Sequence, residues 1–193
     1  FGSGPSKIRP EQVEALDRAA RTLLGTSHRQ APVKELVESI RTGIARFFSL
    51  PDGYEVVLGN GGASAFWDVM CASLITRQAA CGVYGSFSKK VASSVASAPF
   101  LEDPIVFESE PGTYCVPERT EYVDTYCWAQ NETSTGVQAP VHRIDGSREQ
   151  GALIAIDATS AAGAIPVDIS QTDVYYFSPQ KAFGSEGGLW IAI

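Results

Sequence analysis

A lysine and an aspartate near the end of the chain could together hold a cofactor that carries an aldehyde. Asp157 directly follows the apolar run 153–156, and Lys181 lies 24 residues further on, shortly after the apolar run 174–177. If both runs are neighbouring parallel strands, the two side chains meet at one edge of the sheet. A lysine amine forms a Schiff base with an aldehyde, and a carboxylate keeps a pyridine nitrogen protonated. The pair therefore suits pyridoxal phosphate, although each residue taken alone is commonly a loop or turn residue.

A glycine-rich turn, Gly59-Asn60-Gly61-Gly62-Ala63-Ser64, lies between a predicted strand and a predicted helix. Backbone N–H groups at a helix start bind phosphate, although the same glycines could serve only the conformation of a tight turn. A dinucleotide site is disfavoured because no acidic residue lies between Asp68 and Glu102, where a ribose-binding carboxylate would be expected. The G-K-[S/T] sequence of a Walker A loop is also absent.

Three further residues have side chains that could contact a cofactor or substrate. Phe87 opens a predicted helix directly after a strand and could stack on a cofactor ring, although an aromatic residue there is more often part of the core. His28 and Arg29 lie in a polar turn, where the guanidinium could bind a carboxylate or phosphate with two hydrogen bonds. The alternative for this pair is a solvated loop.

Composition and the remaining motifs disfavour several other classes of protein. A formal net charge of −7 disfavours non-specific nucleic-acid binding. No apolar run reaches the roughly 20 residues that span a bilayer, so no membrane association is predicted. The four cysteines contain no C-x-x-C pair and the two histidines no H-E-x-x-H motif, so no metal site is predicted. The G-x-S-x-G motif of many serine hydrolases is absent as well.

Strand and helix patterns alternate along the chain, which predicts an α/β fold with a mostly parallel central sheet and helices on both faces. Because the chain ends inside an apolar strand, we expect a fragment cut at both ends. Helices are predicted over residues 11–24, 33–50, 63–75 and 87–97. Strands are predicted over residues 55–58, 81–84, 105–108, 121–128, 153–156, 174–177 and 189–193.

Six segments of the chain, taken in order, resemble the phosphoserine aminotransferases, a family within the class V group of fold-type I pyridoxal-phosphate enzymes. Each segment is weak evidence alone, but together they extend over nearly the whole chain. The run T-S-H-R-Q-A-P-V-K at 26–34 is similar to the actinobacterial branch. The segments are Phe1-Gly2-Ser3-Gly4-Pro5, Ser27-His28-Arg29, Gly61-Gly62-Ala63-Ser64, Asn131-Glu132-Thr133, Asp157-Ala158-Thr159-Ser160, and Ser178-Pro179-Gln180-Lys181 with Gly187-Gly188-Leu189.

The resemblance implies catalytic roles for Lys181, which would form the covalent link to pyridoxal phosphate, and for Asp157, which would pair with the pyridine nitrogen. Thr133 would donate a hydrogen bond to the phenolic oxygen of the ring. Phe87 would stack on the ring, at a position where the family more often has tryptophan.

The resemblance also implies which residues bind anionic groups. Ala63, Ser64 and Gln180 would hold the cofactor phosphate, the first two through backbone N–H groups. His28 and Arg29 would bind the distal acidic group of the substrate.

The implied reaction is reversible transamination between glutamate and 3-phosphohydroxypyruvate, which gives O-phospho-L-serine and 2-oxoglutarate in serine biosynthesis. Residues 1–193 would form the pyridoxal-phosphate-binding large domain, without the C-terminal small domain of the family. The resemblance further implies a cytoplasmic homodimer.

Three alternatives remain beside this resemblance. The first is another class V enzyme, either a serine–glyoxylate-type aminotransferase or a cysteine desulfurase. Desulfurases typically place histidines where Phe87 and Gln180 stand here. A non-catalytic domain that kept the fold is disfavoured because Lys181 and Asp157 are both present. A nucleotide-binding domain lacks the acidic residue described above.

Overall fold

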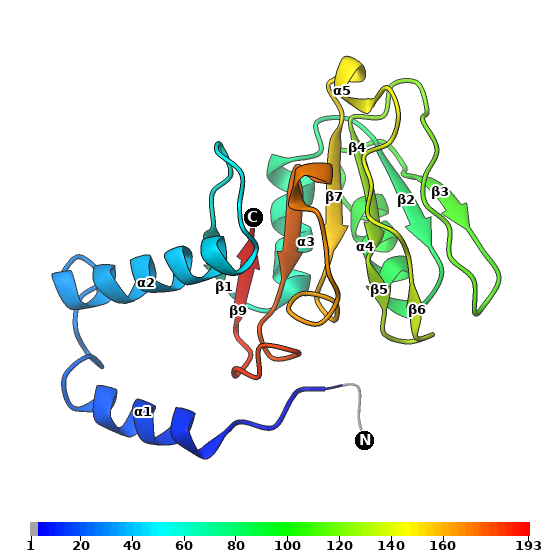
Figure 1. The fold of residues 1–193 in the computed structure, drawn as a ribbon. Coiled ribbons are helices and arrows are strands. Elements are labelled where there is room, and N and C mark those ends of the chain that lie inside the picture. Colours follow the sequence, from blue (N-terminus) through cyan, green and yellow to red (C-terminus); the bar gives the residue numbers. More distant parts are fainter. Residues whose placement is uncertain (1–3) are drawn as a thin grey trace.

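The computed structural model describes residues 4–193. It contains a seven-stranded sheet, a separate two-stranded hairpin and five α-helices among these residues (Figure 1). The helices are α1 (Pro10–Ala20), α2 (Ala31–Phe47), α3 (Ala63–Ser73), α4 (Ser86–Ala96) and the short α5 (Ser147–Gln150), with a 3₁₀ turn η1 at Ile169–Gln171. The strands are β1 (Val57–Asn60), β2 (Ala79–Val83), β3 (Ile105–Glu108), β4 (Thr125–Ala129), β5 (Asn131–Glu132), β6 (Val137–Gln138), β7 (Leu153–Asp157), β8 (Val174–Phe177) and β9 (Leu189–Ala192).

The central sheet has the strand order β1-β9-β8-β7-β4-β2-β3. Strands β3, β2, β4, β7 and β8 are parallel, whereas β9 pairs antiparallel with both β8 and β1. Parallel strands need crossover connections, which here contain α4 between β2 and β3, the β5–β6 hairpin and α5 between β4 and β7, and η1 between β7 and β8, whereas the segment between β3 and β4 is irregular. The predicted α/β fold with a mostly parallel sheet is confirmed.

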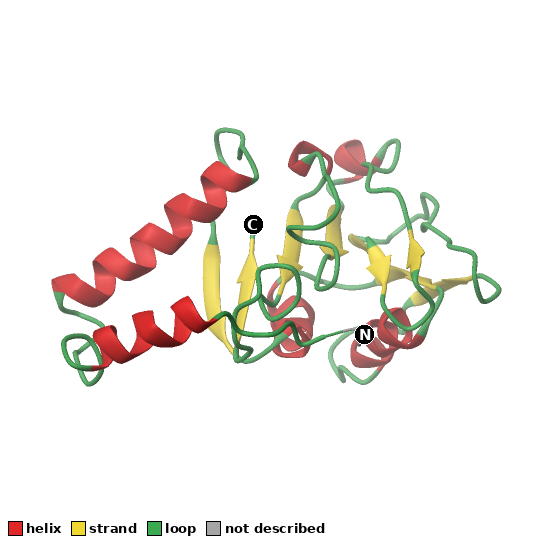
Figure 2. Ribbon diagram, turned by 60° about the horizontal axis from the view of Figure 1, so that its bottom comes forward, coloured by secondary structure: helices red, strands yellow, loops and turns green. Residues whose placement is uncertain are grey.

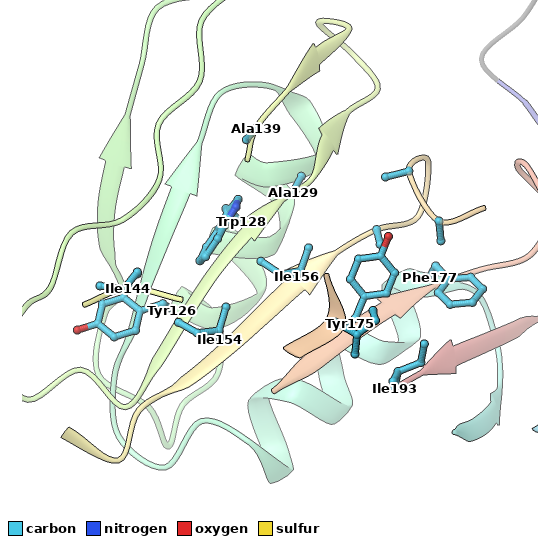
Figure 3. Packing of buried hydrophobic residues seen from close by; sticks show 14 of the residues in the cluster. Tyr126, Trp128, Ala129, Ala139, Ile144, Ile154, Ile156, Tyr175, Phe177 and Ile193 are labelled. Carbon is cyan, nitrogen blue, oxygen red and sulfur yellow. The ribbon is translucent and has the colours of Figure 1, made fainter. Parts of the chain in front are cut away.

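Successive residues of the central strands enter two different hydrophobic clusters, as expected for a sheet buried on both faces. On one face, α3 and α4 cover Cys81, Cys127, Ala155 and Tyr176. The other face carries Tyr126, Trp128, Ile154, Ile156, Tyr175 and Phe177, of which Figure 3 shows the packing. That second face is covered by the end of α2 and by the loop segments 139–144 and 158–169, with less helix than the first.

Some element boundaries differ from the prediction. The strand predicted over 121–128 begins only at Thr125, because the carboxylate of Asp124 accepts hydrogen bonds from the backbone of residues 76–78 and ends the preceding turn. The first helix ends at Ala20 and gives way to turns over 21–25. It buries none of its residues, so no core contact holds a longer helix.

Helices α1 and α2 form an arm that extends away from the sheet (Figures 1 and 2). Only Ile44 near the end of α2 is buried, so most of the arm lies in solvent within this chain. The turn between the two helices contains His28 and Arg29, both exposed. None of the helices over residues 4–193 is long and apolar enough to cross a bilayer.

Candidate active site

A cavity of about 190 Å³ opens at the carboxyl-terminal edge of the parallel strands. It contains all seven residues for which the sequence predicts cofactor binding. Its lining is Gly62, Ala63, Ser64, Trp67, Phe87, Ala129, Asn131, Thr133, Asp157, Thr159, Ser160, Gln180 and Lys181. The structure therefore brings these predicted site residues together, and their binding of a cofactor stays a prediction.

Asp157 ends β7 and is buried, with 8% of its surface exposed. Its Oδ1 accepts hydrogen bonds from the backbone N–H of Thr159 at 2.9 Å and from Thr159 Oγ1 at 2.7 Å. Its Oδ2 accepts one from the hydroxyl of Tyr176 at 3.2 Å. Burial raises the pKa of Asp157, and the hydrogen bonds from Thr159 and Tyr176 act in the opposite direction. Asp157 is therefore a buried carboxylate whose orientation is fixed by three hydrogen bonds.

The start of α3 offers free backbone N–H groups to the cavity. Gly62 is the N-cap and provides no side-chain cap, and the N–H groups of Ala63 and Ser64 have no acceptor among residues 4–193. Gly61 has a φ of 101°, and a Cβ atom there would lie 2.7 Å from the Cβ of Ala65. The turn therefore requires glycine, and it leaves the positive end of the helix dipole facing the cavity.

Lys181 follows β8 and lies beneath the N-terminal segment of the chain. The backbone N–H of Ser6 donates to the carbonyl of Gln180 at 2.7 Å, and the Ser6 hydroxyl donates to the carbonyl of Lys181. A Cβ atom at Gly4 would lie 2.7 Å from Lys181 Cδ and 2.9 Å from its Nζ, so the chain passes directly over the lysine side chain. The other residues of that first predicted segment, Phe1, Gly2 and Ser3, lie outside the described residues.

Phe87 lines one side of the cavity at the start of α4, with 40% of its surface exposed. The buried carboxylate of Glu132 holds this end of the helix, since it accepts hydrogen bonds from the N–H groups of Phe87 at 3.3 Å and Ser88 at 2.8 Å. Lys90 Nζ lies 5.2 Å from the centre of the Phe87 ring. The ring position therefore depends on a carboxylate that does not itself line the cavity.

Thr133 and Asn131 reach the cavity from the hairpin strand β5 and its turn. The Thr133 hydroxyl and the Asn131 side-chain amide each donate to Ser160 Oγ at 2.8 Å, and Ser160 Oγ donates to the Asn131 carbonyl at 3.0 Å. These bonds tie the hairpin to the loop that follows β7. They fix the hydroxyl that was predicted to contact the cofactor's phenolic oxygen.

His28 and Arg29 are not part of this cavity. They lie in the exposed turn of the helical arm, which extends away from the sheet (Figure 1). The sequence could not predict where these two residues lie relative to the cavity. The position of the arm depends on its contacts with the rest of the protein and not on the residue pattern of its two helices. Their predicted role in substrate binding stays a prediction.

Four lining residues with polar or aromatic side chains were not singled out from the sequence as site residues. Trp67 lies one helical turn after Ala63, so its spacing on α3 could have indicated it. Asn131, Thr159 and Ser160 lie within motifs that were recognised, directly beside residues that were selected. Their position within those motifs could therefore have identified these three residues as site residues.

The lining fits pyridoxal phosphate in the chemistry of its donors and acceptors. The free N–H groups of Ala63 and Ser64 suit the phosphate. Gln180 lines the same cavity, and the NH₂ group of its side-chain amide is the donor that suits a phosphate, whereas its buried Oε1, which has no hydrogen-bond partner within the described chain, is an acceptor. The carboxylate of Asp157 suits a pyridinium nitrogen, and Lys181 supplies an amine at the same cavity. No three histidine, cysteine or acidic side chains in residues 4–193 are grouped as metal ligands.

Comparisons with known proteins agree with this arrangement. Residues 113–189 match the family described as Aminotransferase class-V. A protein of Mycobacterium leprae, provisionally named phosphoserine aminotransferase, is 61% identical over all 193 residues, which cover 51% of its length. A phosphoserine aminotransferase of Nocardioides is 54% identical, again over the whole chain and 52% of its own length. The crystal structure of a phosphoserine aminotransferase from Cytophaga hutchinsonii has a TM-score of 0.88 and 27% identity, covering 98% of this chain and 54% of that one.

Residues 113–189 therefore match an aminotransferase class-V domain, and the fold of the chain agrees with that match. Within that family, the sequence relatives described above are named phosphoserine aminotransferases, so the resemblance seen in the six sequence segments is confirmed. The chain spans about half the length of the curated relatives it matches.

Proposed function

We propose that the full-length protein is a pyridoxal-phosphate-dependent phosphoserine aminotransferase. It would transfer an amino group reversibly between glutamate and 3-phosphohydroxypyruvate, giving O-phospho-L-serine and 2-oxoglutarate. The observation that carries the proposal is that Lys181, Asp157 and the free N–H groups at the start of α3 face one cavity. The 61% identity to a relative provisionally given that name supports the choice of substrate.

When bound, pyridoxal phosphate supplies an electron sink that stabilises negative charge at the substrate's α-carbon. Lys181 Nζ would hold the cofactor, and once released from it would accept and return the proton of the substrate's α-carbon. The negative charge of the Asp157 carboxylate would keep a proton on the ring nitrogen of the cofactor. The backbone N–H groups of Ala63 and Ser64, which have no acceptor among residues 4–193, would bind the phosphate, and the NH₂ group of the Gln180 side chain would add a further donor.

Two other side chains would orient the ring. Thr133 would donate to the phenolic oxygen by turning its one O–H away from Ser160 Oγ, to which it donates at 2.8 Å without cofactor. Phe87 would cover one face of the ring and exclude water from it. Its position at the start of α4 and its exposed ring support that role.

A homodimer is the second part of the proposal. The arm formed by α1 and α2 exposes several large apolar side chains, and a second copy that covered them would remove this apolar surface from water. His28 and Arg29, at the end of the same arm, would then be available to bind the distal acidic group of the substrate in the second subunit's cavity. The exposed apolar residues are Val13, Leu16, Leu24, Leu36, Val37 and Phe47.

We also propose that the enzyme works in the cytoplasm. Its phosphorylated substrate and product carry several charges, and transfer of such ions through the apolar part of a membrane is costly. The enzyme would therefore share a compartment with the reactions that make and consume them.

The test uses the full-length protein and its absorbance spectrum after loading with pyridoxal phosphate. We expect visible absorbance from the lysine-bound cofactor, lost in Lys181→Ala and kept in the matched control Lys89→Ala, an exposed lysine on α4. A Lys181→Ala variant that kept this absorbance would refute the cofactor assignment. Turnover of phosphoserine with 2-oxoglutarate should far exceed turnover of unphosphorylated serine. Equal rates would instead favour another class V aminotransferase.

A further inference from the structure

Two consecutive tyrosines on β8 have similar environments but different partners. Tyr175 and Tyr176 expose 0% and 1% of their surfaces, and each hydroxyl donates a hydrogen bond to a side chain. Because side chains alternate along a strand, they point to opposite faces of the sheet. Tyr175 donates to Oε1 of Gln130 at 2.7 Å, within the core cluster shown in Figure 3. Tyr176 donates to Oδ2 of Asp157 at 3.2 Å, on the face covered by α3.

Strand pairing determines the contact between Tyr176 and Asp157. The two residues are directly opposite in the parallel register of β7 and β8, so the backbone places them side by side. The ring of Tyr176 stacks on Phe66 of α3 with 4.5 Å between ring centroids and 28° between planes. The phenol is therefore held between the strand that ends in Asp157 and the helix whose start faces the cavity.

Tyr176 provides the hydrogen bond that acts on the second carboxylate oxygen of Asp157. Thr159 occupies Oδ1 with two hydrogen bonds, whereas the Tyr176 hydroxyl acts on Oδ2. Burial and the nearby Asp157 raise the pKa of Tyr176 well above its ordinary value, so the phenol remains a donor at neutral pH. A neutral donor to a buried carboxylate stabilises its ionised form and limits its rotation.

We propose that Tyr176 is a positioning residue for the proposed transamination, because its hydroxyl orients the Asp157 carboxylate and stabilises its negative charge at the cofactor's ring nitrogen. Tyr176 lies behind Asp157 and does not line the cavity. It would act only through that carboxylate. The inference rests on the proposed function, since it needs a bound pyridine ring.

The matched pair Tyr176→Phe and Tyr175→Phe tests this role in the full-length, cofactor-loaded protein. Both variants lose one buried hydroxyl hydrogen bond, so both should lower the urea midpoint by similar amounts. Only Tyr176→Phe should weaken pyridoxal-phosphate binding, by about tenfold, which corresponds to the loss of one hydrogen bond to a charged group. It should also alter the visible circular dichroism of the bound cofactor, which a purely structural loss would leave unchanged.

A double-mutant comparison shows whether the effect passes through Asp157. In an Asp157→Asn background, the added Tyr176→Phe change should have little further effect on cofactor affinity. If Tyr176→Phe and Tyr175→Phe bind the cofactor equally well with identical spectra, the positioning role is overturned while the proposed function stands. If the wild-type protein shows no bound-cofactor absorbance, the proposed function fails and the role of Tyr176 fails with it.

Discussion

The buried carboxylate of Glu132 gives the sharpest test of how the cavity wall is held. No surface of this residue is exposed, and it has no cationic partner among the hydrogen bonds and ion pairs of residues 4–193. It accepts instead from the backbone N–H groups of Phe87, Ser88 and Ser134 and from the hydroxyls of Ser88 and Ser134. The positive end of α4 therefore balances its charge. The perturbation we consider is Glu132→Gln, which keeps the shape and removes the charge.

The expected loss of stability follows from these contacts. A glutamine offers one acceptor oxygen, and its NH₂ group would face donors that now point to the other carboxylate oxygen. The Ser88 N–H, now 2.8 Å from Oε2, would lose its acceptor, which costs about 1–3 kcal/mol for a buried donor. Loss of a negative charge at a helix start adds about 0.3–1 kcal/mol. We expect the free energy of unfolding to fall by about 1–4 kcal/mol in total.

The pH dependence of this difference has a definite sign. Burial alone would raise the pKa of Glu132, but hydrogen bonds from Ser88 and Ser134 outweigh it and leave the pKa below its ordinary value. A carboxylate with a lowered pKa in the folded state stabilises the protein above the unfolded pKa and loses that contribution as the pH falls through the folded pKa. The stability gap between wild type and Glu132→Gln should therefore be full at neutral pH and shrink under acidic conditions.

The measurement is urea unfolding at several pH values, with hydrogen exchange of residues 85–92 as a local readout. Glu110→Gln is the control, because Glu110 is exposed and its side chain makes no hydrogen bond or ion pair in the described chain. Faster exchange at the start of α4 should accompany weaker cofactor binding, since Phe87 is held there. A Glu132→Gln variant as stable as Glu110→Gln at neutral pH would refute this account of the helix start.

Two further predictions concern glycine positions and the helical arm. Gly59→Ala should destabilise the protein by about 1–3 kcal/mol, because a Cβ atom there would lie 2.0 Å from the Trp190 ring, whereas Gly43→Ala, in open space within α2, should stabilise it by about 1 kcal/mol. If Gly59→Ala and Gly43→Ala shift the urea midpoint of unfolding in the same direction, the predicted opposite effects are wrong. Leu16→Asp on the arm should shift the full-length protein from dimer toward monomer in light scattering, while Glu14→Asp on the same helix should not. An unchanged dimer in Leu16→Asp would contradict the proposed interface.

Much of the fold could be predicted from local patterns because the central strands are short, apolar and clearly bounded. The strands β3 and β8 have the predicted limits, and β7 extends the predicted run by one residue to Asp157. The start of β4 was wrong because Asp124 makes its hydrogen bonds to residues 76–78, which are far away in the sequence. The hairpin of β5 and β6 was missed because each strand has only two residues, too few for a periodic pattern.

The residues of the candidate site also form two groups. Some are marked by local sequence patterns, and others reach the site only through contacts between distant parts of the chain. Asp157 and Lys181 could be selected because each follows an apolar strand, and the glycine-rich turn marks the start of α3. The partners of these residues could not be selected, since Tyr176 reaches Asp157 only through the register of β7 and β8. Ser160 reaches Thr133 across two different loops, which no spacing along the chain reveals.

The charges around the cavity explain why part of the substrate site should lie elsewhere. Among the described residues that line it, Lys181 is the cation and Asp157 the anion. The backbone N–H groups of Ala63 and Ser64 suit one phosphate, and the proposed chemistry uses the lysine amine for the cofactor. A substrate that carries both a phosphate and a carboxylate would then find little positive charge in this lining. Cationic side chains from outside this lining are therefore required, which is the physical reason to expect His28 and Arg29 at the cavity of a second subunit.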